Sequence, residues 1–402
     1  MLKKKIILGI IILSILFSTT ACWDNENVDD IAFVTGIGFD KSEEGMIEVT
    51  VQLVVPTFLQ QREQGSDEEA FWTISFEEET VFGAVKGMLS TVNRRLFRNH
   101  IHIIVIGEDL AREGIIDVLD FLERDHEMKK NAEMLVARGS TAQKVLQAQS
   151  NLEDIPSIHL TDIMENANQL AKLKQKDLIT LLREINQQGQ SSVIGTVQIV
   201  GQDGKDEPAE EADNGEEALL LKDMIVEGAA AFKETQLVGW LSPPETRGYL
   251  FAQGEVIDGI INIDNPHDRE QRVSIEVRSA GAEPEVELKD GEPRLSIEVW
   301  ATGNLGEQQG AGNLTTQSDF AELAKELSAL IEEEIREVVD LAQQDYEADI
   351  FGFGELMRRE HPDYWQQVRG DWEQEFSQAP VEIEVQTTIR KPRMIRMPTR
   401  PK

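Results

Sequence analysis

Residues 100–107, HIHIIVIG, and residues 133–137, EMLVA, are two short apolar runs on either side of a segment with helical periodicity. Apolar runs of this length are typical of strands. The segment between them repeats its apolar side chains on one helical face, at Leu110, Ile115, Val118, Leu119 and Leu122. A strand, a helix and a second strand in succession predict a sheet whose strands are covered by helices.

A β-hairpin is predicted before this unit. Ile31–Phe39 is rich in β-forming residues, Gly45 supplies a turn, and apolar residues alternate along Ile47–Val55. A further strand is expected at 71–76, and a helix with Thr80 as its N-cap follows it. The order of these elements indicates a mixed sheet in the first half of the chain.

The next part of the chain consists of a predicted helical region followed by a polar segment. Residues 141–190 are expected to be mostly helical, with a break at Pro156. Residues 201–217, GQDGKDEPAEEADNGEE, are rich in glycine and acidic side chains, which is typical of a solvated loop or linker. We therefore place the main domain boundary in this segment.

The second half is expected to open with two strands around a turn at Glu234-Thr235. Alternating apolar residues at 273–277 and 295–299 predict neighbouring antiparallel strands. A long helix, capped by Ser318, is predicted from apolar residues that recur at helical spacing between 320 and 350. A shorter amphipathic helix through Trp365, Val368, Trp372 and Phe376 and a final strand at 381–389 complete the pattern.

These patterns predict an α+β protein of several domains, with mixed and antiparallel sheets flanked by helices. We expect an N-terminal domain at 22–200, an acidic linker at 201–218, a C-terminal domain at 219–390 and a basic tail at 391–402. From Arg390 onward the chain carries six basic residues and no acidic one. Such a tail is usually a disordered end, and the alternative is contact with anionic lipid head groups.

The first 21 residues have the three-part layout of a secretory signal peptide. Three lysines precede an apolar run from Ile6 to Phe17, and small residues then lead into Cys22. The run is too short to cross a hydrocarbon core that is roughly 30 Å thick. We therefore predict that residues 1–21 are a cleaved signal peptide.

Cys22 is the candidate lipidation site. It is the only cysteine of the chain, so an intramolecular disulfide cannot use it. A cysteine after small residues is where a bacterial lipoprotein signal receives its diacylglyceryl group, and the new terminus is often acylated, for example with palmitate. Thr19 stands where such signals usually have leucine. The alternative is an ordinary signal peptide with an unrelated cysteine.

Composition excludes some classes of partner. The 402 residues have a formal net charge of −35, which becomes about −38 without residues 1–21, because that segment contains three lysines and no acids. So acidic a surface argues against nucleic-acid binding, which requires basic side chains for the phosphates. Repulsion would also keep the protein off anionic lipid. A covalent tether is therefore the expected route to the membrane.

Few residues suggest chemistry. His100 and His102 would face one side of a strand and could in principle bind zinc, but the other histidines are scattered, so packing is the preferred interpretation. Gly352-Phe353-Gly354 lacks the third glycine and the preceding strand of a phosphate loop, and a turn explains it. We predict no metal and no cofactor.

Catalytic motifs are missing as well. The chain has no Gly-x-Ser-x-Gly, His-Glu-x-x-His or Walker motif, so we expect a protein that is not an enzyme and has no catalytic residues. The many carboxylates neither exclude nor identify a glycosidase-type pair. Arg94, Arg95 and Arg98 could pair with the protein's own acids or receive an acidic partner. Trp365, Trp372 and Phe376 are expected in the core.

Four segments together resemble the Ger(x)C family, the C subunits of spore germinant receptors. They are Cys22-Trp23-Asp24 with the Ile31–Asp40 strand, LFRNHIHIIVIGEDLAREGIIDVLDFLERD at 96–125, GAAAFKETQLVGWLSPPETRGYL at 228–250, and DIFGFGELMRREHPDYWQQVRGDWEQEF at 349–376. They occur in the family's order over most of the mature chain. The Thr19 position, the acidic insertion and the basic tail depart from the family's pattern.

The resemblance implies a lipoprotein on the outer face of the inner spore membrane. It implies work beside a multispanning A subunit and a transporter-like B subunit in the response to small nutrients, with no catalytic residues assigned. The family's α+β fold has three domains, so the second half would divide again near residue 310. The residues do not indicate whether this subunit binds a nutrient itself. The alternatives are a solute-binding lipoprotein of a transporter and, less favoured, a lipid-anchored hydrolase.

Overall fold

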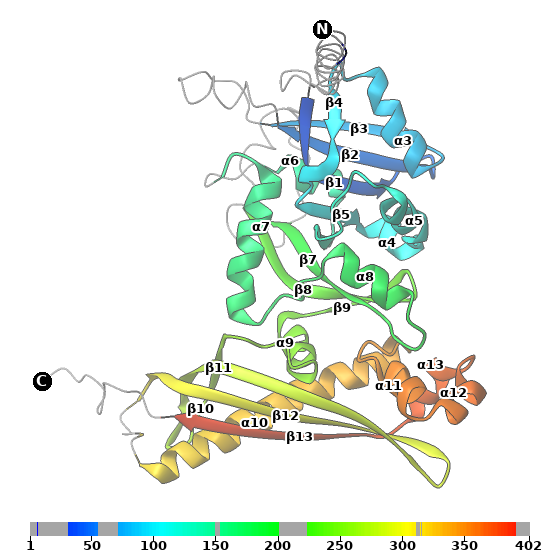
Figure 1. The fold of residues 1–402 in the computed structure, drawn as a ribbon. Helices are drawn as coiled ribbons and strands as arrows, with labels where there is room; N and C mark the ends of the chain where they lie inside the picture. The colour runs from blue at the N-terminus through cyan, green and yellow to red at the C-terminus, as the bar shows by residue number, and fades with distance from the viewer. Residues whose placement is uncertain are drawn as a thin grey trace, which may run out of the picture.

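The computed structural model describes residues 31–54, 71–148, 153–200, 223–310, 314 and 316–390, together with the single residue Ile6 (Figure 1). The strands in these ranges form two sheets. The predicted signal peptide with Cys22, the acidic linker at 201–218 and the basic tail at 391–402 lie outside the described residues. The fold class is α+β with mixed and antiparallel sheets, as predicted.

The first sheet has nine strands in the order β3-β2-β1-β5-β6-β7-β8-β9, and the short β4 pairs with β1. The pairs in the middle, from β1 to β7, are parallel, whereas the pairs at both ends are antiparallel. The sheet is therefore mixed. Its strands are β1 Ile31–Lys41, β2 Ile47–Val54, β3 Trp72–Glu78, β4 Arg95–Phe97, β5 Ile103–Gly107, β6 Glu133–Ala137, β7 Val193–Val200, β8 Asp223–Lys233 and β9 Gln236–Leu241.

Helices cover both faces of this sheet (Figure 1). Successive residues of β5 explain how: Ile104 and Ile106 pack into one core, whereas Ile103 and Val105 pack into the other, because side chains alternate along a strand. The first core contains α3 Val81–Gly87, α4 Glu108–Glu113, α5 Ile116–Arg124 and α8 Leu178–Ile185, and the second contains α6 Ala142–Gln147 and α7 Pro156–Ala167. Short 3₁₀ turns are η2 Met88–Ser90, η3 Arg98–His100 and η4 Asn168–Leu170.

The first sheet contains strands that precede residues 201–222 in the sequence and strands that follow them. The hairpin of β8 and β9 follows the segment that we predicted as a linker, yet β8 pairs with β7 from Val193↔Ala231 to Val200↔Asp223. The turn between β8 and β9 lies at Glu234 and Thr235, as the sequence predicted. This hairpin therefore ties the second half of the chain to the first sheet.

The second sheet has four strands in the order β10-β11-β12-β13, and α10 covers one of its faces (Figure 1). Alternation decides which face is covered: Leu295, Ile297 and Val299 of β12 are buried, whereas the residues between them face outward. The elements are α9 Pro243–Ala252, β10 Gly259–Asn265, β11 Asp268–Lys289, β12 Glu292–Gln308, α10 Gln317–Asp340 and β13 Val381–Arg390. The predicted strands at 273–277 and 295–299 belong to β11 and β12, which are antiparallel neighbours as expected, and the final strand is confirmed as β13.

Two predictions for the long helix were wrong. Its N-cap is Thr316 and not Ser318, because Thr316 and Asp319 form a reciprocal capping box: each side chain accepts from the other residue's backbone N–H. The α-helix also ends at Asp340, where one π-helical turn, η5 Leu341–Asp345, replaces it, so Ile350 is not part of it. In the described ranges, no helix is long and apolar enough to cross a membrane.

The single helix predicted through Trp365, Val368, Trp372 and Phe376 is two short helices, α12 Pro362–Val368 and α13 Trp372–Gln378, and a third, α11 Phe353–Glu360, precedes them. Pro362 starts α12 at a position that suits proline, and Gly370 lies in the turn before α13. The expected burial was right nonetheless, because Trp365, Trp372 and Phe376 all lie in the core of the second half.

Candidate functional site

His100 and His102 lie outside any strand, so the shared strand face that we expected for them is wrong. Arg98–His100 form the 3₁₀ turn η3, and the strand begins only at Ile103, so the two histidines do not share a strand face. The imidazole of His100 packs edge-on against Phe33, with 5.0 Å between ring centroids, and lies 5.6 Å from Phe97. Across the described ranges, no three His, Cys, Asp or Glu side chains are placed to hold a metal ion.

The arginine cluster pairs with the protein's own acids. Arg98 Nε lies 2.7 Å from Asp125 Oδ2, and its Nη2 lies 3.2 Å from Glu127. Arg95 also reaches Glu127, at 3.4 Å. Burial raises the pKa of Asp125, but hydrogen bonds from Arg98 and the backbone N–H of Glu127 outweigh it and hold that pKa below its usual value. This supports the first of the two interpretations, an internal role for these arginines.

The most concentrated polar cluster surrounds Asp349, in the turn before α11. Its fully buried carboxylate accepts hydrogen bonds from the N–H groups of Gly352 at 2.9 Å and Gly354 at 2.7 Å and from the indole of Trp372 at 2.9 Å. Its backbone carbonyl accepts from Ser191, in the loop before β7, at 2.8 Å. The cluster therefore fastens the helices α11 and α13 to the first sheet.

A second carboxylate lies beside Asp349. Glu373 accepts the backbone N–H of Asp349 at 3.1 Å. Burial, followed by the charge of Asp349, raises the pKa of Glu373 to about 7. Burial also raises the pKa of Asp349 to about 6, although the hydrogen bonds that its carboxylate accepts oppose the shift. Both groups therefore titrate well above ordinary carboxylates.

The glycines predicted as a turn serve this cluster. Gly352 has a φ of 82°, which favours glycine, and it starts α11. A Cβ on Gly354 would lie 2.4 Å from the indole nitrogen of Trp372 and 2.5 Å from the carbonyl oxygen of Gly189. The glycines therefore form a turn and also allow the backbone at Gly354 to lie close to the backbone at Gly189.

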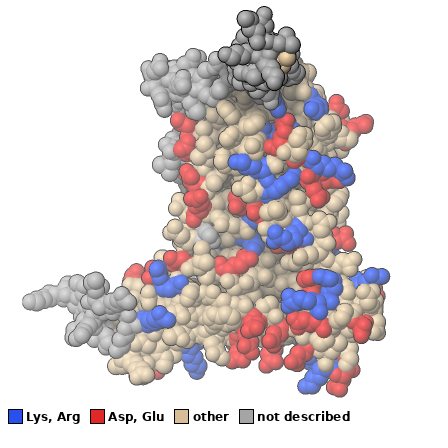
Figure 2. Space-filling model, in the orientation of Figure 1, with Lys and Arg blue, Asp and Glu red and all other residues tan. Residues whose placement is uncertain are grey.

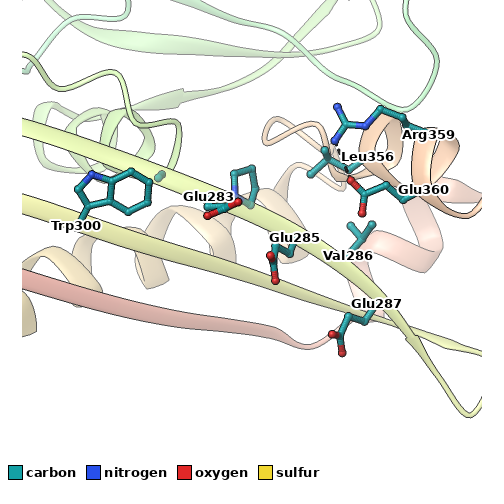
Figure 3. A pocket seen from close by; sticks show the side chains of 10 residues that line it. Glu283, Glu285, Val286, Glu287, Trp300, Leu356, Arg359 and Glu360 are labelled. Atoms are coloured by element: carbon teal, nitrogen blue, oxygen red, sulfur yellow. Dashed lines mark hydrogen bonds and ion pairs between the residues drawn. The ribbon is translucent and has the colours of Figure 1, made fainter.

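A groove lies along the outer half of β11 (Figure 3). Its volume is about 630 Å³, and it runs between residues 282–287 of β11 and α11. Glu283, Glu285 and Glu287 are exposed along it, and Leu356, Arg359 and Glu360 of α11 form its other side. Figure 2 shows acidic side chains gathered over the lower part of this view, where Figure 1 places the second sheet.

Neither the Asp349 cluster nor the groove was predicted from the sequence. The groove had a signal, because acids at every second position of Glu283-Pro284-Glu285-Val286-Glu287 predict a strand with one acidic face. Asp349 had none, because an aspartate next to a glycine-rich turn is common and its burial depends on residues distant in sequence.

Two family models match the chain. The model described as "Spore germination protein N-terminal domain" matches residues 24–199, and the model described as "Spore germination B3/ GerAC like, C-terminal" matches residues 227–393. Together they account for all but the ends of the chain and the segment between them.

Individual proteins agree with the models. The chain is 24% identical to Spore germination protein KC of Bacillus subtilis over 395 residues, covering 96% of each protein, and 24% identical to Spore germination protein B3 of the same organism, covering 93% of this chain and 94% of that one. The crystal structure of the GerBC protein has the same fold, with a TM-score of 0.55 at 20% identity, over 88% of this chain and 96% of that one. The chain belongs to the Ger(x)C family of spore germination proteins.

Proposed function

We propose that this protein is the lipid-anchored C subunit of a spore germinant receptor, and that it acts by assembly with the A and B membrane subunits and not by catalysis. The observation that carries the proposal is the match of the two spore germination models to residues 24–199 and 227–393. The predicted lipidation site, Cys22, lies two residues before the first matched residue.

The arrangement of the chain suits a tether at Cys22. Only eight residues lie between Cys22 and Ile31, where β1 begins, and the chain from Cys22 to Ile31 spans at most about 30 Å. The start of β1 lies at one end of the molecule and the second sheet at the other (Figure 1). A lipid on Cys22 would therefore hold the first sheet close to the outer face of the inner spore membrane, with the second sheet farther out.

Tethering favours assembly because it confines the chain beside its partners. Binding to a neighbour then depends on a local effective concentration, so a modest interface is sufficient. The tether also explains how so acidic a protein can stay at a membrane. An anionic lipid surface would repel it, and the covalently attached lipid would hold it there.

The test compares spores that lack this protein and are complemented with the native chain, with Cys22→Ala or with Thr19→Leu. Cys22→Ala is expected to leave the membrane fraction and to weaken nutrient-triggered germination. Thr19→Leu, which supplies the residue usual at that signal position, is expected to behave as the native chain does. A Cys22→Ala protein that remains acylated and membrane-bound, or that supports normal germination, would refute the proposal.

A further inference from the structure

The outer half of β11 is a sheet edge. β10 pairs with β11 only as far as Val277, whereas β12 continues to pair with it up to Lys289. Within the described ranges, residues 278–289 therefore have a strand partner on one side only. An unpaired strand edge presents a row of backbone donors and acceptors to any chain that can align with it.

Two contacts show which residues direct their backbone groups to this edge. The N–H of Ala280 donates to the carbonyl of Val256 at 3.2 Å, and His361 Nε2 lies 3.4 Å from the carbonyl of Val286. Both partners lie on the side away from β12. Backbone direction alternates along a strand, and the register is regular from Ser279 to Lys289, so every even-numbered residue from 280 to 288 faces the edge.

This edge is only partly protected. Pro284 faces it and has no N–H, a usual feature of edge strands, but Pro284 still offers its carbonyl. In the part of the chain that the structure describes, Ala282 and Leu288 make no backbone hydrogen bond on this side. Gly254 lies against Ala282, since a Cβ on Gly254 would be 2.7 Å from the backbone nitrogen of Ala282, and His361 approaches the carbonyl of Val286. Among the described residues, the groups left open on this side are the carbonyl of Pro284, the N–H of Val286 and both groups of Leu288, over about five residues, the length of a short strand.

The side chains of the edge strand divide into an acidic and an apolar face. Glu283, Glu285 and Glu287 are exposed on one face, whereas Val286 is buried and Leu288 half-buried on the other. On β12 the acidic face continues at Glu298, opposite Glu283, and Arg294 lies opposite Glu287. Arg359 at the groove wall already pairs with Glu360, at 2.8 Å. The groove therefore has a net negative charge.

We propose that the edge Pro284–Leu288 binds an extended segment of a partner protein, which adds to the second sheet as a fifth strand. Main-chain hydrogen bonds would supply affinity, as in other cases of strand addition. Lys or Arg at alternate positions would face Glu283, Glu285 and Glu287, because cross-strand neighbours lie about 5 Å apart and opposite charges there are favourable. Small apolar residues would alternate with them, towards Val286 and Leu356.

Charge and chain chemistry exclude two other occupants of this edge. A second copy of β11 would bring its own alternating glutamates opposite these ones, which is unfavourable. The chain's own basic tail carries Pro392, Pro398 and Pro401, and each proline removes a donor that a strand needs. A basic segment of a different protein, without prolines, would supply both the opposite charge and the backbone N–H donors.

The test uses a fluorescent heptapeptide of alternating lysine and valine, KVKVKVK, and the full chain in detergent at fixed ionic strength. Fluorescence anisotropy is expected to show binding that weakens by about tenfold or more in E283Q/E285Q/E287Q, which loses three cross-strand charge pairs. The matched control is E332Q/E333Q/E337Q on the exposed side of α10, which removes equal charge and is expected to stay within about twofold of the native chain.

Further measurements separate strand addition from simple charge attraction. The peptide is expected to slow amide hydrogen exchange at residues 284–288, and a version with alternate backbone N-methyl groups is expected not to bind. Equal loss of binding in the two triple variants, undiminished binding of the N-methylated peptide, or no binding to the native chain would overturn the proposal. Tighter peptide binding after deletion of residues 391–402 would also overturn it, because the tail would then be the occupant.

Discussion

The indole N–H of Trp372 donates a 2.9 Å hydrogen bond to Oδ2 of Asp349, a carboxylate with no exposed surface. The same carboxylate accepts from the backbone at Gly352 and Gly354. Through the carbonyl of Asp349 the cluster also reaches Ser191, before β7. One residue therefore joins α13, the start of α11 and the loop before β7 of the first sheet.

Replacing Asp349 with alanine is expected to lower the free energy of unfolding by about 3 kcal/mol, because three buried donors lose their acceptor. Urea denaturation of the body from residue 23 onward measures the change. Asp363→Ala, at an exposed position on α12, is the control and is expected to leave stability unchanged. Equal stability of Asp349→Ala and the native chain would show that the cluster does not join the two halves.

Stability is expected to fall as pH rises from about 4 to about 7. The pKa of Glu373 is raised from 4.5 to about 7 and that of Asp349 from 3.8 to about 6, so the folded state holds protons that the unfolded state has released. The contribution of both groups is complete below their unfolded pKa values and is lost as pH passes their folded ones.

Glu373→Gln isolates this effect, because glutamine retains an acceptor for the N–H of Asp349 and does not ionise. Relative to the native chain, the variant is expected to gain stability between pH 4 and 7 and then to keep a constant advantage. Glu382→Gln, exposed on β13, should follow the native pH profile. Parallel profiles for the native chain and Glu373→Gln would contradict the raised pKa.

Gly354→Ala is expected to destabilise the protein by about 2 kcal/mol or more, because the new Cβ would lie within 2.5 Å of two atoms, the Trp372 indole nitrogen and the Gly189 carbonyl oxygen. One of these is backbone and cannot easily move. Gly370→Ala is the matched control, since a Cβ there meets nothing within 4 Å. Thermal unfolding of the two variants measures the difference, and equal melting temperatures would disprove the close contact.

Arg98→Ala is expected to cost about 2 kcal/mol, because it leaves Asp125, whose side chain is 4% exposed, without its charged partner. Arg124→Ala breaks an exposed pair with Asp120 and is expected to have no measurable effect. Urea denaturation compares them. If Arg98→Ala is as stable as the native chain, the arginine cluster is free to serve an acidic partner instead.

Most of the first sheet was predictable because its signals are local. The alternation along Ile47–Val54, the Gly45 turn and the buried runs at 103–107 and 133–137 each depend on neighbouring residues. The predicted helix at 110–122 was wrong in one respect: it is divided into α4 and α5 at Gly114, whose φ of 132° does not fit a helix.

The Asp349 cluster and the open edge of β11 depend on residues that are far apart in the sequence. The Asp349 cluster needs Trp372 and Ser191, and the open edge of β11 depends on where β10 stops pairing. Neither can be read from local periodicity. Cys22 is the reverse case, because its prediction rests on local sequence alone and the residue lies outside the described part of the structure.

The central claim is that this chain acts by assembly at the membrane. The most direct test is affinity purification of a tagged native chain, with Cys22→Ala beside it, from detergent-solubilised inner spore membranes. We expect the A and B subunits to be retained with the native chain and lost with Cys22→Ala. Recovery of the native, lipid-modified chain without either membrane subunit would contradict the claim.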